Sequence, residues 1–174
     1  MNVASEVALE IFNALYFIFP AYCANGAPVL FGGGRPIDGG KKFLDGKPIF
    51  GPHKTIRGFA SGLIIGTFVG WVQEAYGLSV GLPQGNMILG FALSLGALLG
   101  DLLGSFIKRR MNLEPGKHLP LSDQLDFVLA ALLFSLPVKP PSIMDALIIV
   151  VLTVPIHFLV NIMAYLLKLK KTPW

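Results

Sequence analysis

The sequence predicts an all-α integral membrane protein that forms a single domain over residues 1–174. Hydrophobic residues make up 53% of the chain and charged residues only 14%, whereas a soluble domain carries about 25% charged residues. The apolar residues come in runs close to the roughly 20 residues that a helix needs to cross a bilayer. The Lys and Arg residues gather in a few segments between these runs. Together these observations indicate membrane-spanning helices.

Five apolar runs are expected to form transmembrane helices. Their approximate ranges are 7–27, 58–76, 86–107, 122–136 and 143–167. No Lys or Arg precedes the first run, so it lacks the basic segment of a cleaved signal peptide. In the second run, glycines recur every four residues and form a smooth stripe against which a neighbouring helix can pack closely. The glycines of this stripe are Gly58, Gly62, Gly66 and Gly70.

The basic residues predict the orientation of the helices. The segments 31–57 and 108–121 and the tail after residue 167 hold all of the 14 Lys and Arg residues except Lys139. Lys and Arg concentrate in cytoplasmic loops, so these segments and the C-terminus are expected in the cytoplasm, with the N-terminus outside. We therefore read the net charge of +4 as a topology signal and expect no nucleic-acid partner. The single cysteine, Cys23, excludes an internal disulfide.

Three acidic residues lie near the predicted cytoplasmic ends of two neighbouring helices. Asp101 lies about 10 Å along its helix from Lys108, at 1.5 Å per residue. Asp123 and Asp126 are three residues apart and so share one face at the start of the next helix. Ionisable side chains within a membrane are costly and usually functional. Because Mg²⁺ prefers oxygen ligands and often binds carboxylates together with phosphates, these residues predict a magnesium–phosphate centre.

Simpler explanations exist for part of this acidic cluster. Asp123 could cap its helix or stabilise the first turn through the helix dipole. Asp101 could form an ion pair with Lys108 or Arg109. Neither alternative explains Asp126.

The glycine-rich segment 31–57 is expected to bind phosphate on the same side of the membrane. Its glycines can present backbone N–H groups to an anion. Lys54, Thr55 and Arg57 lie at the start of the second helix, whose N-terminus favours anions. No GxxxxGK(S/T) pattern of a P-loop occurs. For Lys41 and Lys42, attraction to anionic lipid is the alternative explanation.

Four further polar residues have open interpretations. Asn25, near the cytoplasmic end of the first helix, could line the pocket or cap a broken helix. His157 is interpreted as a hydrogen-bonded packing residue within the fifth helix. His53 and His118 lie in the two cytoplasmic loops, where each could contact phosphate or be solvated.

These motifs resemble a known family. Ser-Phe-Ile-Lys-Arg at residues 105–109, followed by Asp-Gln-Leu-Asp at 123–126, is similar to the signature of membrane CDP-diglyceride synthases. The turn between the two parts is shorter here, the Lys-Asp and His-Gly-Gly elements are missing, and Gln124 replaces an Arg. The compact CDP-archaeol synthase family is a closer match over nearly the whole chain. The matching segments are NGAPVLFGGGRPIDGGKKFLDGKPIFGPHKTIRG, GDLLGSFIKRR and LPLSDQLDFVLAAL.

The resemblance implies a nucleotidyltransferase with Mg²⁺ as cofactor, located in the cell membrane with its site on the cytoplasmic face. It would transfer CMP from CTP to 2,3-bis-O-geranylgeranylglycerol 1-phosphate and release pyrophosphate. Asp101, Asp123 and Asp126 are then expected to hold Mg²⁺ and, with Lys108, to be catalytic. The residues expected to bind the nucleotide or lipid phosphate are Asn25, Asp38, Lys54, Thr55, Arg57 and Arg109.

Three other functions are compatible with parts of the sequence. A cytidylyltransferase for diacyl phosphatidic acid would use the same chemistry, and apolar side chains do not distinguish acyl from isoprenoid tails. A small ion or phosphate transporter would show inverted repeats, but the sequence has no internal repeat. A CDP-alcohol phosphotransferase would carry a DGxxAR-type motif, which is absent from this sequence.

Overall fold

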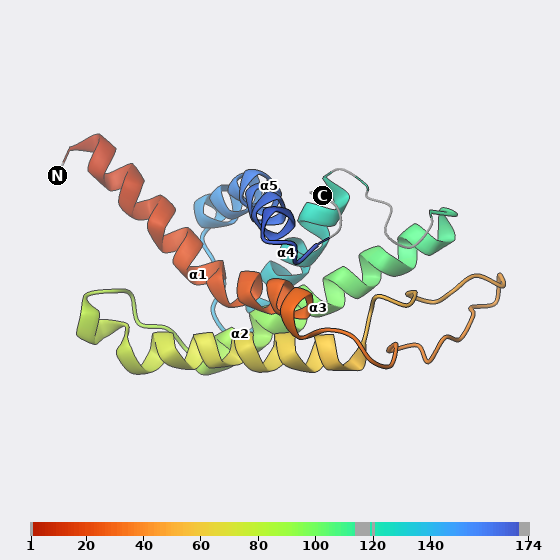
Figure 1. The fold of residues 1–174 in the computed structure, drawn as a ribbon. Coiled ribbons are helices and arrows are strands. Elements are labelled where there is room, and N and C mark those ends of the chain that lie inside the picture. The colour runs from red at the N-terminus through yellow and green to blue at the C-terminus, as the bar shows by residue number, and fades with distance from the viewer. Residues whose placement is uncertain (1, 114–118, 120, 171–174) are drawn as a thin grey trace.

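The computed structural model describes residues 2–113, 119 and 121–170. Over these residues it is a bundle of α-helices (Figure 1) and contains no β-strand, which confirms the all-α class. The helices are α1 (Val3–Phe31), α2 (Ile56–Tyr76), α3 (Met87–Arg110), α4 (Ser122–Ser135) and α5 (Ile143–Leu166), with a short 3-10 helix, η1 (Leu78–Val80), between α2 and α3. Each predicted apolar run therefore forms one helix.

Three of these helices are long and apolar enough to cross a membrane. By length and composition these are α1, α3 and α5. Helix α4 has 14 residues, which is about 21 Å at 1.5 Å per residue, less than the roughly 30 Å of a hydrocarbon core. Helix α2 is rich in glycine and packs its glycines inward.

The predicted glycine stripe places α2 against both α1 and α3. A Cβ atom added to Gly62 would lie 2.6 Å from the carbonyl oxygen of Ala24 in α1. One added to Gly70 would lie 2.6 Å from the Cα of Gly90 in α3. Helix backbones can approach this closely only where side chains are missing. The interpretation of the stripe as a packing surface is therefore confirmed.

A second glycine stripe, on α3, receives α4. Gly96, Gly100 and Gly104 face α4, and a Cβ added to Gly96 would lie 2.6 Å from the carbonyl oxygen of Ala130. At Gly104 an added Cβ would collide with the carboxylate of Asp126. The missing side chain at Gly104 therefore leaves space for a charged group between the two helices.

Helix α5 is held against the bundle by a small number of specific contacts. The hydroxyl groups of Tyr22 in α1 and Thr153 in α5 are hydrogen-bonded at 2.8 Å. Ile149 of α5 is fully buried in the core, where Phe127 and Val128 of α4 also lie. About half of the remaining α5 residues are exposed.

The long loop at residues 32–55 lies at the end of the bundle where α3 ends (Figure 1). Arg110, the last residue of α3, anchors it. The Arg110 guanidinium lies 5.0 Å from the ring centre of Phe43 and 4.7 Å from that of Phe106, a cation–π arrangement. It also forms a 3.2 Å ion pair with Asp45, and Lys47 Nζ donates to the Arg110 carbonyl at 3.0 Å. The loop is thus fixed beside the ends of the helices.

Candidate functional site

A cavity of about 780 Å³ lies between the helices and the loop at residues 32–55. All five α-helices contribute to its wall. Its lining is charged where α3 and α4 meet the loop and largely apolar along α1 and α5. The predicted site residues that line it are Asn25, Lys54, Thr55, Asp101, Lys108, Arg109 and Asp123.

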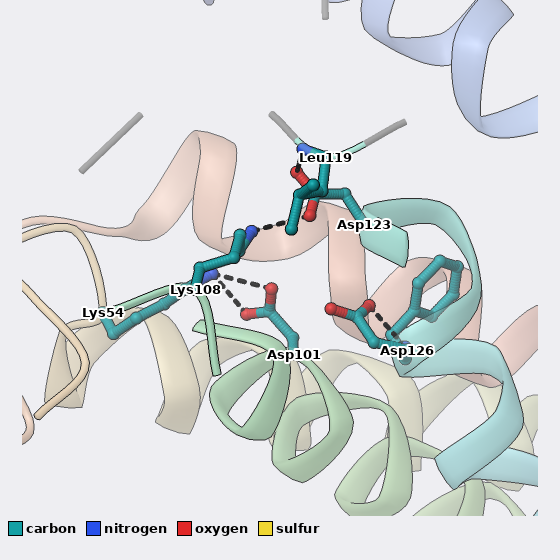
Figure 2. Close-up of polar contacts among 7 residues, drawn as sticks. Lys54, Asp101, Lys108, Leu119, Asp123 and Asp126 are labelled. Carbon is teal, nitrogen blue, oxygen red and sulfur yellow. Dashed lines mark hydrogen bonds and ion pairs between the residues drawn. The ribbon is translucent and has the colours of Figure 1, made fainter. Parts of the chain in front are cut away.

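Asp101 connects α3 to the loop through Lys54. Lys54 Nζ donates to both carboxylate oxygens of Asp101, at 2.7 and 2.6 Å (Figure 2). The position of Lys54 is fixed because Thr55 caps α2: its hydroxyl accepts a hydrogen bond from the Gly58 N–H at 3.1 Å. A Thr at this position stabilises the start of a helix. Thr55 therefore holds Lys54 in place as well as lining the cavity.

Asp123 forms a second ion pair, with Lys108. The Lys108 Nζ lies 2.8 Å from Asp123 Oδ1, and both side chains are only 13% exposed. The other carboxylate oxygen accepts from the backbone N–H of Leu119 at 3.3 Å, and the buried Arg109 interacts electrostatically with Asp123. Leu121, not Asp123, is at the N-cap of α4. The carboxylate is therefore directed toward basic groups of α3 instead of capping its own helix.

Asp126 faces α3 in the space left by Gly104. Its Oδ1 accepts from the backbone N–H of Phe127 at 2.6 Å, and the Asp101 and Asp126 carboxylates point toward one another (Figure 2). Asp126 also interacts electrostatically with both Asp101 and Asp123. Asp101 and Asp126 thus face one another between α3 and α4, and Asp123 lies within electrostatic reach of Asp126.

The cations beside these acids are side chains of the protein, Lys54, Lys108 and Arg109. Within the described part of the chain, no group of three or more His, Cys, Asp or Glu side chains has the arrangement of a metal site. Asp101 and Asp123 instead pair with Lys54 and Lys108. The magnesium site stays a prediction.

Three predicted site residues are not part of the cavity lining. Asp126 lies behind it, between α3 and α4, and Arg57 is exposed on the first turn of α2. Asp38 is buried in the loop, where its carboxylate accepts backbone N–H bonds from Gly40, Phe50 and Gly51 at 2.9, 2.9 and 3.1 Å. Burial alone would raise the pKa of Asp38, but these bonds outweigh it and hold the pKa below its ordinary value. In this structure Asp38 organises the loop.

The α5 side of the cavity carries polar residues that sequence analysis did not single out. Lys170 Nζ donates to Asn161 Oδ1 at 2.9 Å, and Asn161 Nδ2 lies 3.0 Å from His157 Nδ1. All three line the cavity, as does His53. His157 is hydrogen-bonded and lies against the Phe127 ring, as expected, but it also faces the cavity. His118 lies outside the described residues. The sequence did contain a signal for this polar group, because His157 and Asn161 lie four residues apart in an otherwise apolar helix.

The cavity combines paired charges with an apolar wall, inside a bundle of helices of which three are long and apolar enough to cross a membrane. This combination suits an intramembrane enzyme whose substrate is a charged lipid. Comparison with known proteins agrees. Residues 7–174 match the family described as CarS-like, CDP-archaeol synthase. CDP-archaeol synthase of Pyrococcus abyssi is 47% identical over 168 residues, covering 94% of this chain and 98% of the relative. That of Methanopyrus kandleri is 46% identical over 180 residues, covering 100% and 99%.

A solved structure is similar as well. It is described as an intramembrane enzyme for the biosynthesis of archaeal membrane lipids, with a TM-score of 0.76 and 37% identity over 87% of this chain and 94% of the other. The chain belongs to the CDP-archaeol synthase family. This membership confirms the resemblance and the prediction of a lipid nucleotidyltransferase. It does not favour a transporter, a CDP-alcohol phosphotransferase or a synthase for diacyl lipid.

Proposed function

We propose that this protein transfers CMP from CTP to 2,3-bis-O-geranylgeranylglycerol 1-phosphate, giving CDP-archaeol and pyrophosphate. The supporting observation is that the Lys54–Asp101 and Lys108–Asp123 pairs lie in the same cavity, beside an apolar wall of α1 and α5. This arrangement suits one substrate with several phosphates and another with a phosphate on long hydrocarbon chains. Membership of the family supports the same reaction.

The basic residues would neutralise the phosphates of both substrates. Lys54 and Lys108 already lie beside carboxylates, so each would exchange a carboxylate for a phosphate oxygen when the substrates enter. Arg109 is buried at the same wall. Charged donors that are fixed before the reaction stabilise a transition state without reorganisation. Phosphate binding would also release Asp101 and Asp123 from their lysines.

The acidic residues of the site have the ligand chemistry that magnesium prefers. Asp101, Asp123 and Asp126 offer only oxygen donors, and Asp101 and Asp123 both lie within electrostatic reach of Asp126. We propose that these three residues hold Mg²⁺. When bound, the ion would supply charge neutralisation at the phosphate oxygens of CTP.

The reaction itself requires mainly positioning. A lipid phosphate oxygen would attack the α-phosphorus of CTP as the bond from that phosphorus to the bridging oxygen breaks. The electron pair of the broken bond leaves with pyrophosphate. No general base is needed, because the lipid phosphate is already anionic at neutral pH. Holding the two phosphates close and in line would supply much of the rate enhancement.

The proposed topology places this cavity at the cytoplasmic face. Five crossings put the N-terminus outside and the C-terminus inside, and the positive-inside rule assigns the loop at residues 32–55 to the cytoplasm. Because α4 is short for a full crossing, its N-terminal acids would lie below the membrane surface. CTP would enter from the cytoplasm and the lipid from the bilayer.

The direct test uses purified protein, Mg²⁺ and CTP radiolabelled at its α-phosphate. We expect label in an organic-extractable product with the isoprenoid ether phosphate, and little with diacyl phosphatidic acid or without lipid. Asp145→Asn, at the start of α5 and outside the cavity lining, is a matched control that should retain activity. The absence of labelled product with either lipid, from folded protein, would refute the proposal.

A further inference from the structure

The C-terminal end of α5 turns the chain back toward the cavity. After Leu166 the backbone N–H of Lys168 bonds to the Tyr165 carbonyl at 2.9 Å, and that of Leu169 to the Ala164 carbonyl at 2.8 Å. These two bonds form a Schellman turn, whose left-handed residue is usually glycine. Here it is Lys168, with a φ of 59°. A non-glycine residue in this conformation is costly and is retained where surrounding contacts hold it.

The turn directs Lys170 to a defined position. Its Nζ donates to Asn161 Oδ1 at 2.9 Å, and Asn161 is in turn hydrogen-bonded to His157 at 3.0 Å. The ammonium of Lys170 is half-buried and lines the cavity. A lysine that served only as a topology signal would extend into water. The contacts of Lys170 instead hold its charge inside the site.

Lys170 lies within electrostatic reach of Lys54. Burial lowers the pKa of Lys170, the nearby Lys54 lowers it further, and Asp123 opposes both effects. Two cations at one partly desolvated cavity repel one another, and an anion between them removes this repulsion. The pair Lys54 and Lys170 is therefore suited to a phosphate that lies between the loop and α5.

The surroundings of Lys170 indicate which phosphate this is. Val160 and Met163 of α5, and Leu167 at its C-cap, line the same cavity and give its wall here a hydrocarbon surface. Lys108 and Arg109 lie at the end of α3, where Lys108 forms an ion pair with Asp123. An anion at Lys170 would thus be next to apolar side chains. A lipid phosphate has this combination of charge and hydrocarbon.

We infer that Lys170, positioned by Asn161 and by the turn at Lys168, binds the phosphate of the lipid substrate opposite Lys54. The inference rests on the proposed function and adds a residue on α5 to the lipid subsite. The α5 tail would then contribute to the lipid affinity, whereas the nucleotide would be bound mainly from the end of α3.

The test measures KM for the lipid phosphate and for CTP separately in two charge-matched variants. Lys170→Met removes the cavity cation, whereas Lys168→Gly removes one tail charge and keeps the left-handed turn. We expect Lys170→Met to raise KM for the lipid about tenfold, the loss of one charged hydrogen bond, with KM for CTP within about twofold. Lys170→Arg should restore most of the lipid affinity, and Lys168→Gly should match the wild type.

Two results would overturn the inference. If Lys170→Met raises KM for CTP and leaves KM for the lipid unchanged, Lys170 binds the nucleotide instead. If both KM values are unchanged, Lys170 binds neither substrate. Equilibrium binding of the radiolabelled lipid phosphate without CTP tests Lys170 even where no turnover occurs, and an equal Kd for wild type and Lys170→Met would refute it. If Lys170→Met does not fold, Asn161→Leu replaces it, with the same expected selectivity for the lipid. Failure of the proposed function is distinct: wild-type protein would form no labelled lipid.

Discussion

At the residue scale, the site is a set of charges that compensate one another. The bonds from Lys54 to both oxygens of Asp101 join a loop to the middle of α3, and Lys108 joins the end of α3 to the first turn of α4. A lone charge is costly near a bilayer interior, and removal of one partner from a buried pair leaves the other uncompensated. The pairs therefore keep the charged groups inside the bundle until a substrate takes their place.

Asp126 provides the sharpest residue-scale prediction. Asp126→Asn keeps the shape of the side chain beside Gly104 but removes its charge. We expect CMP transfer to fall by on the order of 100-fold, because the charge stabilisation at the phosphates is weakened, while detergent-solubilised protein keeps the wild-type unfolding midpoint. Asp145→Asn is the control for the same chemical change outside the cavity. Activity near the wild-type level in Asp126→Asn would contradict the metal assignment.

The hydrogen bonds of Asp38 predict that the stability of the loop at residues 32–55 depends on pH. Because its pKa in the folded protein is lowered from 3.8, its carboxylate stabilises the loop above that pH, and the contribution is lost as the pH falls below it. Amide exchange at Phe50 and Gly51, corrected for intrinsic rates, should accelerate in the acidic range. Asp38→Asn should show faster exchange already at neutral pH. Equal protection of the two proteins at neutral pH would show that the carboxylate does not hold the loop.

Sequence reasoning selected both acidic and basic residues that line the cavity, but it missed Lys170. Asp101, Asp123 and Asp126 stood out because a carboxylate within an apolar run is rare and helical spacing fixes its direction. Lys170 did not stand out, because its place depends on a left-handed turn at Lys168 that no glycine marks. The role of Asp38 in the loop depends on backbone N–H groups 12 and 13 residues away, which no local pattern reveals.

At the element scale, two glycine stripes determine how the helices pack. One on α2 receives α1 and α3, and the other on α3 receives α4. The first was predicted from its four-residue spacing. The second has the same spacing but was recognised only once α4 was seen against it. Helix α1 was expected to end near residue 27 but continues to Phe31 through Pro28, because that proline removes only one backbone N–H donor.

Substitution of Gly66 tests whether the glycine stripe on α2 determines helix packing. A methyl group at Gly66 would collide with Ser94 and lie 2.7 Å from the Pro20 carbonyl oxygen, so Gly66→Ala should destabilise the protein by about 1–3 kcal/mol through overpacking. Gly26→Ala is the matched control, because nothing lies within 4 Å of an added Cβ. It should be neutral or slightly stabilising. Thermal unfolding in detergent measures both, and equal unfolding midpoints would contradict the packing.

Substitution of Gly104 tests whether the packing of α3 against α4 also positions the Asp126 carboxylate. A Cβ there would displace the Asp126 carboxylate, whereas one at Gly100 would meet the Asp126 backbone carbonyl. A carboxylate can move more easily than a helix backbone, so Gly104→Ala should lower activity with a small change in unfolding midpoint. Gly100→Ala should mainly lower the midpoint. A lower unfolding midpoint with nearly normal activity in Gly104→Ala would show that Gly104 does not position the Asp126 carboxylate.

At the scale of the whole molecule, the charge distribution predicts an orientation of the helices but not their spatial arrangement. The predicted cytoplasmic loop does lie at the end of the bundle where α3 ends (Figure 1). The short connection between α3 and α4 correctly predicted that they are neighbours. The cavity could not be predicted, because it depends on how α5 packs against α1 and α4, and the apolar residues of α5 give no preferred direction.

Cysteine labelling tests the proposed orientation. In a Cys23→Ser background, Leu44→Cys introduces a thiol in the loop, at a position that is 96% exposed, and Val80→Cys introduces one in η1, at a position that is 67% exposed. A membrane-impermeant maleimide added to intact cells should label residue 80 only. Inverted vesicles should give the opposite result. Labelling of both positions from one side would refute the five-crossing topology.

The glycine contacts also affect which substitutions the chain can accept over time. Large side chains such as Ile64 and Leu133 are 67% and 63% exposed, and lipid tails accommodate one aliphatic shape as readily as another. Gly62, Gly66 and Gly70 have no room even for a methyl group. The usual pattern of soluble proteins, in which bulky residues are the least replaceable, is therefore reversed. Sequence drift in this chain should be slowest at its smallest residues.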